Sequence, residues 1–186
     1  MRKVILTCAV TLDGYIARPD GSVDYLVMTR EGMRFLTKFF ATVDTIIMGR
    51  KTLDAAKAMS GGSYQSPVPG MPTYVFSRSQ PTGGRDGIIF TNQSPAALVR
   101  QLRARPGKHI CHMGGGELAR GFLEADLVDE LFLHVAPILL GSGIPLFPAG
   151  FPQRDFTLVE NGDSKSQLYL TYRRLRSKAK RKGRKA

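Results

Sequence analysis

The chain has 186 residues, 42% of them hydrophobic, which suits one domain with a substantial core and leaves no room for a second domain. Its formal charge of +12 is concentrated at one end, because the segment from Arg173 to Ala186 holds nine Lys or Arg residues and no acidic residue. The other 18 of the 27 basic residues are nearly balanced by 15 acidic ones, which argues against a body built to bind nucleic acid. We expect a folded domain over residues 1–175 and a basic disordered tail over 176–186, which has nothing to bury.

No apolar run approaches the ~20 residues that a membrane span requires. The charged start of the chain leads into a short apolar strand rather than into the core of a signal peptide. Cys8 and Cys111 lie in apolar runs without a metal-binding spacing, which favours two reduced core thiols. We therefore expect a cytoplasmic protein with no membrane partner and no metal.

Predicted strands and helices alternate through the first two thirds of the chain. In chain order they are a strand at Lys3–Val10, a short strand at Tyr15–Ala17, a helix at Arg30–Thr42, a strand at Thr45–Met48, a helix that begins at Gly49, strands at Thr73–Phe76 and Gly87–Phe90, a helix that Ser94 caps and that ends near Arg103, a strand at His109–Met113, a helix at Glu117–Glu124 and a long strand at Val128–Ala136. This alternation predicts a mostly parallel central sheet with helices on both faces.

The last third has a different pattern. A Gly/Pro-rich connection without charged residues covers Pro137–Pro152, and two alternating segments follow at Phe156–Glu160 and Gln167–Arg173. These two segments predict an antiparallel pair of strands at the edge of the sheet. The fold class is therefore α/β, with a mostly parallel sheet and antiparallel C-terminal strands.

Two junctions between a strand and a helix carry glycine, Met48–Thr52 and Met113–Glu117. A helix N-terminus offers unpaired N–H groups and the positive end of a dipole, and glycine lets a phosphate approach the backbone. Arg50 and Lys51 add positive charge, while Ser77 and Arg78 at another strand end suit a further phosphate on an adenosine ribose. The spacing differs from the GxGxxG fingerprint, so the residues alone indicate a phosphate-binding α/β domain and no more.

Several motifs together resemble the dihydrofolate-reductase-like superfamily. They are Leu12–Ala17, Asp44–Thr52, Val75–Arg78, Gly114–Leu118, Leu127–Leu131 and Pro137–Gly141. Within this superfamily the chain is most similar to the branch of the reductase C-terminal domain of the riboflavin-biosynthesis protein. The resemblance covers about Lys3 to Tyr172 and implies the family's three-layer fold, with NADPH as the cofactor.

The resemblance also implies a set of cofactor-binding residues. Ala9 and Ile16 would line the nicotinamide pocket, and Ser77 and Arg78 would contact the ribose 2′-phosphate. The phosphates and the nicotinamide ribose would be held by Gly49, Arg50, Lys51, Thr52, Gly114, Gly115, Gly116, Glu117 and Leu118. In such an enzyme the cofactor carries the hydride chemistry and the protein supplies position.

Candidate substrate-binding residues are less clear. Dihydrofolate reductases have a carboxylate on the helix before the Gly-Arg-Lys-Thr junction, where this chain has Met33. The riboflavin-pathway reductases have a lysine and an acidic residue at the positions that Thr7 and Met113 occupy here. Asp24 and Tyr25 follow a glycine turn and suit either a planar substrate or a surface turn. The catalytic residues are therefore unknown.

Three histidines, His109, His112 and His134, lie on predicted strands. They could form a metal or acid/base set, but their place on strands favours structural roles.

We expect an NADPH-dependent reductase that transfers hydride to a small planar heterocycle other than dihydrofolate or the riboflavin-pathway pyrimidine. One alternative is a nucleotide-binding member of the family without catalysis, and another is a nucleic-acid-associated protein that acts through its basic tail. The apolar C-terminal strands and the Pro137–Pro152 connection favour a homodimer. In the competing interpretation, this connection packs on its own domain.

Overall fold

The computed structural model describes residues 1–59, 65–80, 82–164 and 167–176. In chain order its elements are β1 (Val4–Thr11), β2 (Tyr15–Ala17), α1 (Arg30–Phe40), β3 (Val43–Gly49), α2 (Arg50–Met59), β4 (Thr73–Phe76), β5 (Gly83–Arg85), β6 (Ile88–Thr91), α3 (Pro95–Arg103), β7 (His109–Met113), α4 (Gly116–Glu124), β8 (Glu130–Ala136), β9 (Ile144–Pro145), β10 (Phe156–Asp163) and β11 (Leu168–Arg174). Of the predicted tail, residues 177–186 lie outside the described residues. Within the described ranges, no helix is both long enough and apolar enough to cross a membrane.

One nine-stranded sheet runs through the molecule in the order β10-β11-β8-β1-β7-β3-β4-β6-β5. The strands from β8 to β6 in this order are parallel, whereas β5 pairs antiparallel with β6 at one edge. At the other edge β11 pairs antiparallel with β8, and β10 pairs antiparallel with β11. The predicted α/β class with antiparallel C-terminal strands is confirmed.

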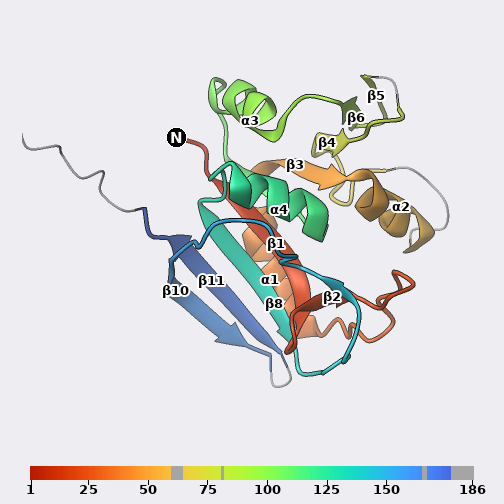
Figure 1. The fold of residues 1–186 in the computed structure, drawn as a ribbon, viewed down its shortest axis with the longest axis vertical. Coiled ribbons are helices and arrows are strands. Elements are labelled where there is room, and N and C mark those ends of the chain that lie inside the picture. The colour runs from red at the N-terminus through yellow and green to blue at the C-terminus, as the bar shows by residue number, and fades with distance from the viewer. Residues whose placement is uncertain (60–64, 81, 165–166, 177–186) are drawn as a thin grey trace, which may run out of the picture.

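Helices α3 and α4 cover one face of the sheet, and α1 and α2 cover the other, which gives three layers (Figure 1). One core packs α3 and α4 against the sheet through residues such as Leu98, Phe122 and Leu133. The second core packs α1 and α2 against the opposite face, with Phe39 and Leu53 among its buried residues. Side chains of the central strands alternate between these two cores, as in a parallel sheet that is covered on both sides.

Some elements differ from their predicted form. Two short strands were not predicted, β5 within a Gly-rich segment and β9 within the apolar connection, because neither has enough residues to show a period. Strand β10 continues three residues beyond its predicted end, since its pairing with β11 carries it through Asn161 and Gly162. Helix α1 ends at Phe40, two residues early, because β3 begins at Val43.

The connection between β8 and β10 packs on its own domain along much of its length. Leu146 is fully buried in the core, and β9 pairs with β2. The Asp13 carboxylate accepts hydrogen bonds from the backbone N–H groups of Leu140 and Gly141, at 3.0 and 2.8 Å. This segment therefore supports the competing interpretation of the connection, and Leu139 is its most exposed large apolar residue.

Candidate functional site

The parallel strands end at one common edge of the sheet, where α2 and α4 begin. Strands β3 and β7, which lead into these two helices, are neighbours. A Cβ built on Gly115 would lie 3.0 Å from the Oγ1 atom of Thr52, and one built on Gly114 would lie 3.7 Å from its Cγ2 atom. The first turns of α2 and α4 are therefore in contact, as the two glycine junctions predict.

The helix starts differ in how their free N–H groups are satisfied. The hydroxyl of Thr29 caps α1 by accepting from Gly32, and the hydroxyl of Ser94 caps α3 by accepting from Ala97. Helix α4 begins after Gly115 without a side-chain cap. Its first N–H groups and the positive end of its dipole are thus available to an anion.

The glycines at this edge serve two different purposes. Gly114 and Gly115 have φ values of 55° and 82°, a conformation that other residues rarely adopt, so they let the chain turn sharply into α4. A Cβ on Gly49 would meet no atom within 4 Å, so this position opens onto free space at the start of α2. A Cβ on Gly116 would overlap the carbonyl oxygen of Pro145, so Gly116 allows the β9 segment to pack closely.

Arginine side chains are arranged along the same edge. Arg50 forms an ion pair with Asp54 at 2.8 Å and lies over the ring of Phe90, whereas Lys51 is exposed. Ser77 follows β4, and its hydroxyl accepts hydrogen bonds from the next turn at 3.1 and 3.3 Å. Arg78 is exposed beside it. The charges predicted for phosphate binding therefore lie at strand ends, where Lys51 and Arg78 face solvent and Arg50 is partly buried.

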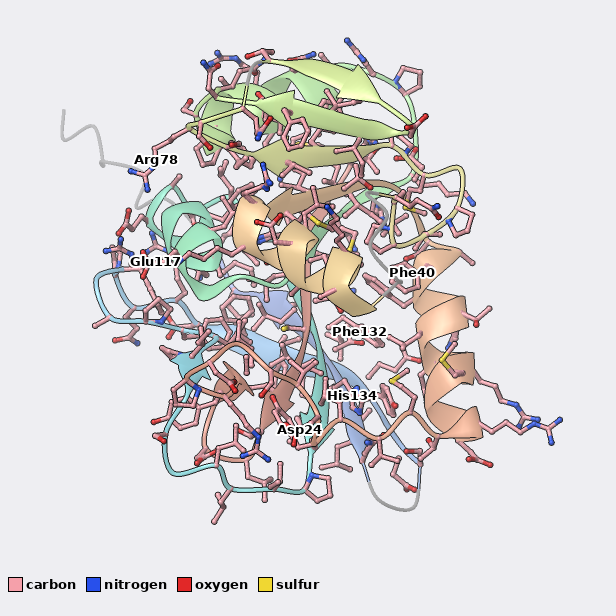
Figure 2. The ribbon with its side chains drawn as sticks, turned by 90° about the vertical axis from the view of Figure 1, so that its right-hand side faces the viewer. Asp24, Phe40, Arg78, Glu117, Phe132 and His134 are labelled. Atoms are coloured by element: carbon pink, nitrogen blue, oxygen red, sulfur yellow. The ribbon has the colours of Figure 1, made fainter. Side chains whose placement is uncertain are left out.

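Two predicted cofactor contacts belong to α4. Glu117 is in its first turn, and its side chain is 78% exposed and pairs with Arg120 at 2.8 Å. Leu118 is half-buried and packs against the α3–α4 core. Figure 2 shows Arg78 and Glu117 projecting on the same side of the molecule. The Glu117 carboxylate points outward, so its backbone rather than its charge would face an anion.

Strand β1 lies in the sheet between β7, which leads into α4, and β8, which pairs with the C-terminal strands. Ala9 lies near its end, and Thr7 is paired with Met113 on β7. A Cβ on Gly114 would lie 3.6 Å from the Sγ atom of Cys8, and burial raises the pKa of this thiol to about 12. Cys8 is therefore a neutral apolar neighbour of the site rather than a nucleophile. Ile16 on β2 is partly buried against the α3–α4 core.

Tyr25 has an unusual environment for a loop residue. Its hydroxyl is enclosed and has no hydrogen-bond partner among the described residues. Burial, together with the nearby Cys8 sulfur, raises the pKa of this phenol. A buried hydroxyl without a partner costs free energy, so this group is suited to a ligand or a water molecule.

The other two predicted substrate residues are more exposed. Asp24 pairs with Arg18 at 2.7 Å, and this hydrogen bond lowers the pKa of the Asp24 carboxyl, so the group is ionised at neutral pH. Met33 lies on α1 with half of its surface exposed. Of the three candidates, only Tyr25 combines enclosure with an unsatisfied polar atom.

The histidines do not form one set. His112 is fully buried, stacks on Phe122 and belongs to the face that α3 and α4 cover. His134 lies on the opposite face, where it stacks on Tyr169. His109 lies at the other end of β7. In the described part of the chain, no three His, Cys, Asp or Glu side chains are grouped to hold a metal.

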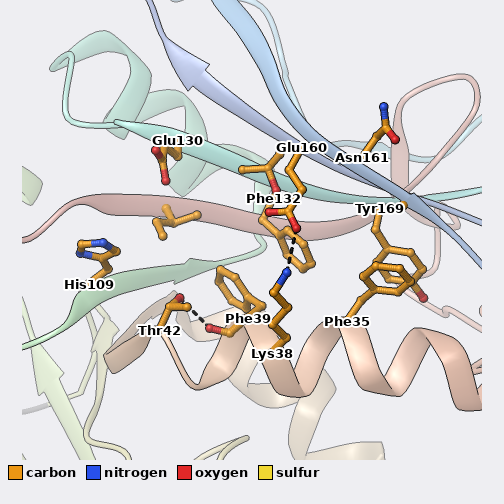
Figure 3. A pocket seen from close by; sticks show the side chains of 13 residues that line it. Phe35, Lys38, Phe39, Thr42, His109, Glu130, Phe132, Glu160, Asn161 and Tyr169 are labelled. Carbon is orange, nitrogen blue, oxygen red and sulfur yellow. Dashed lines mark hydrogen bonds and ion pairs between the residues drawn. The ribbon is translucent and has the colours of Figure 1, made fainter.

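A shallow hollow of about 230 Å³ lies elsewhere, between α1 and the C-terminal strands (Figure 3). Its floor is aromatic and includes Phe35 and Phe132, and the ion pair of Lys38 with Glu160 crosses its mouth at 2.9 Å. Ile5 and His109 place it toward the beginning of the parallel strands. It is therefore separate from the edge where α2 and α4 begin.

Comparison with known proteins identifies the family. The model of the RibD C-terminal domain matches residues 2–168. The chain belongs to the RibD C-terminal domain family. Two proteins of Bacillus subtilis (strain 168), the uncharacterized proteins YwjB and YyaP, are each 38% identical to it, over 147 and 159 residues. These matches cover 78% of this chain in both cases, and 83% and 80% of the relatives.

Solved structures share the fold. A putative riboflavin biosynthesis protein from Shewanella sp. PV-4 superposes with a TM-score of 0.79 at 28% identity, and the match covers 94% of this chain and 99% of that one. RibD of Acinetobacter baumannii superposes with a TM-score of 0.73 at 20% identity over 94% of this chain and 58% of its own. The predicted superfamily and its riboflavin-biosynthesis branch are thus confirmed.

Proposed function

We propose that this RibD C-terminal domain is an NADPH-dependent reductase that transfers hydride to a small planar heterocycle. The observation that carries the proposal is the contact between the first turns of α2 and α4, where Gly115 lies against Thr52 and α4 has no side-chain cap. Two adjacent helix N-termini suit the two phosphates of a dinucleotide. When bound, NADPH would supply the hydride.

The residues at this edge fit such a cofactor. Gly49, Gly114 and Gly115 leave the backbone open to phosphate, and Lys51 and Thr52 would add a charge and a hydroxyl. Ser77 and Arg78 would bind the 2′-phosphate that distinguishes NADPH from NADH, so this pair bears most directly on cofactor choice. Gly116 would contribute its N–H group, like Glu117 and Leu118, while its missing side chain serves packing against Pro145.

The nicotinamide ring would lie near the end of β1, beside Ala9 and Ile16. Asp24, Tyr25 and Met33 would line the substrate side, with the Tyr25 hydroxyl as hydrogen-bond donor. Thr7 and Met113 are directly paired, so the positions that distinguish this chain from the riboflavin-pathway reductases form one patch. This patch supports the proposal of a different substrate for this protein.

The test is a fluorescence titration with NADPH, followed by NADPH oxidation in the presence of pterins, pyrimidines and quinones. We expect saturable NADPH binding and oxidation with at least one member of the panel. Binding without oxidation would support the non-catalytic alternative. If NADPH does not bind, the proposal is wrong. The nucleic-acid alternative rests on a basic segment of which residues 177–186 lie outside the described residues.

We also propose a homodimer through the C-terminal strands. Leu158 and Val159 on the edge strand β10, and Leu168 on β11, are each more than 40% exposed. An unpaired apolar edge favours association with a second copy. Light scattering at micromolar concentration should give twice the chain mass of 20.4 kDa, and Leu158→Glu should shift it toward the monomer. A wild-type monomer would refute this proposal.

A further inference from the structure

His134 is the neighbour of Ala9 across the sheet. The two residues are paired in the register of β1 with β8, and His134 is paired in turn with Tyr169 on β11. Paired residues of adjacent strands project to the same face. Phe132 and Tyr169 belong to the core under α1 and α2, so His134 and Ala9 face that side as well. Figure 2 shows Phe132 and His134 on this face.

His134 is a polar exception on this face. It is only 4% exposed, while nearby core positions such as Ile5 and Phe132 are apolar. Burial lowers the pKa of His134, and the Gln167 side chain offsets this effect only in part, so the imidazole is neutral at physiological pH. An apolar residue would avoid this desolvation cost, which makes a retained histidine a candidate for recognition.

A chain of contacts fixes one side of the imidazole. The ring stacks on Tyr169 with centroids 4.7 Å apart, and its Nε2 atom lies 3.5 Å from the Tyr169 hydroxyl. This hydroxyl donates to the Oε1 atom of Gln167 at 3.3 Å, and the Gln167 amide donates to the carbonyl oxygen of Val27 at 2.6 Å. With the hydroxyl donating to Gln167, its oxygen accepts from Nε2–H in the tautomer that leaves Nδ1 as an acceptor.

Among the described residues, the hydrogen-bond partners of the imidazole are the side chains of Tyr169 and Gln167, and Nδ1 is not among the fully enclosed polar atoms that lack a partner. The acidic groups at this edge already have hydrogen-bond or ion-pair partners. Asp13 accepts from Thr11 and from two backbone N–H groups, and Asp24 pairs with Arg18. In this tautomer, His134 offers Nδ1 as an acceptor at the position next to Ala9.

We propose that His134 forms the wall of the substrate pocket beside Ala9, and that its Nδ1 atom accepts a hydrogen bond from an N–H group of a planar substrate ring. This inference rests on the proposed reductase function, which places the nicotinamide at Ala9. It narrows the substrate to heterocycles with a ring N–H or an amino group on the edge that faces the sheet. Tyr169 and Gln167 act as positioning residues, because they hold the imidazole in one tautomer.

The test uses ¹⁵N resonances of the His134 imidazole, assigned by their loss in His134→Phe. We expect these resonances to shift when NADP⁺ binds, and not when the same cofactor without nicotinamide, 2′-phospho-ADP-ribose, binds. In the NADP⁺ complex, uracil should shift Nδ1, whereas 1,3-dimethyluracil, which has no N–H group, should not. Tyr169→Phe keeps the stacked ring and should convert the single tautomer into a mixture.

The outcomes separate this inference from the proposed function. If NADP⁺ binds but both cofactor forms, or neither, shift His134, the imidazole is not beside the nicotinamide and the inference is wrong. If uracil and 1,3-dimethyluracil act alike, the N–H preference is wrong. If the Tyr169→Phe spectrum keeps one tautomer, the positioning role is wrong. Absence of NADP⁺ binding would overturn the reductase proposal and this inference with it.

Discussion

The two ends of the parallel strands differ in how their polar groups are satisfied. At the amino end, Arg2 is buried and bonds to Asp44, to Thr45 and to two backbone carbonyls. Arg103 pairs there with Asp129 at 2.5 Å. At the carboxyl end, α4 is uncapped and the Tyr25 hydroxyl is enclosed without a partner among the described residues.

This difference separates residues that stabilise the fold from residues that we propose to bind a ligand. A closed hydrogen-bond network contributes to stability only while all its members are present, because removing one member leaves its buried partner without a hydrogen bond. Unsatisfied buried groups lower the stability of the unliganded protein, yet they can bind a ligand. Substitutions at the amino end should therefore change the free energy of unfolding, and those at the carboxyl end should change affinity.

The largest effect should come from Arg2→Ala. Loss of the guanidinium removes the ion pair with Asp44 and the side-chain hydrogen bonds to Thr45 and to the carbonyls of Leu102 and Lys108, which should lower the free energy of unfolding by about 3 kcal/mol. Urea denaturation measures this loss, while NADPH affinity should stay unchanged. Lys38→Ala is the control, since it breaks only an exposed pair and should cost less than about 0.5 kcal/mol. Equal losses in the two variants would contradict the distinction between the two ends.

Gly49→Val should affect binding rather than stability. Its side chain would enter the open space at the start of α2, so we expect NADPH affinity to fall by about 100-fold, which corresponds to about 2.7 kcal/mol. Gly121→Ala is a matched control, because its Cβ also meets open space, but within α4. That change should leave affinity intact and stabilise the helix by about 0.5–1 kcal/mol. If Gly49→Val binds NADPH as tightly as the wild type, the carboxyl edge of the sheet is not the cofactor site.

His112 lies in the core between the two edges and should make stability depend on pH. Burial lowers the pKa of His112 to about 3, whereas an unfolded histidine titrates near 6.5. The unfolded state therefore binds more protons in this window, and stability should fall as pH decreases from 6.5, by up to about 1.4 kcal/mol per pH unit for this group. Chemical denaturation between about pH 7.5 and 5 measures the slope, which His112→Leu should reduce. An unchanged slope would mean that His112 does not control it.

Arg78→Ala should have a smaller effect, confined to cofactor choice. We expect the wild type to bind NADPH at least about ten times more tightly than NADH, since a charged hydrogen bond to the 2′-phosphate contributes about 1.5–3 kcal/mol. The variant should lose most of this preference without a change in NADH affinity. Arg105→Ala, at another exposed arginine, serves as the control. Equal affinities for the two cofactors in the wild type would contradict the assignment of Ser77 and Arg78.

The smallest effect should follow truncation after Ser177. The removed segment has no large apolar residue, and Arg176, which pairs with Asp126 and Asp129, is retained. We expect thermal and chemical stability to change by less than about 0.5 kcal/mol, with NADPH affinity nearly unchanged. A larger loss would mean that the segment contributes to the fold.

The sequence predicted the long elements because their apolar residues repeat with a clear period. It also indicated both glycine junctions, since a glycine between a buried strand and a helix start marks a sharp turn with an accessible backbone. It did not predict β9, whose two residues, Ile144 and Pro145, show no pattern until Tyr15 and Ala17 pair with them. Nor did it separate Gly116 from its neighbours, because the carbonyl of Pro145 that requires a glycine there comes from a distant segment.

By itself, the sequence determined the α/β class, the order of the elements and the family resemblance, since these depend on local periods and on motifs in a fixed order. Only the tertiary structure decided which polar groups are satisfied. Tyr25 and His134 look like ordinary loop and strand residues in the sequence, and the contacts of His134 come from segments as distant as Gln167 and Tyr169. Satisfaction of a buried polar atom depends on contacts between such segments, which no local pattern records.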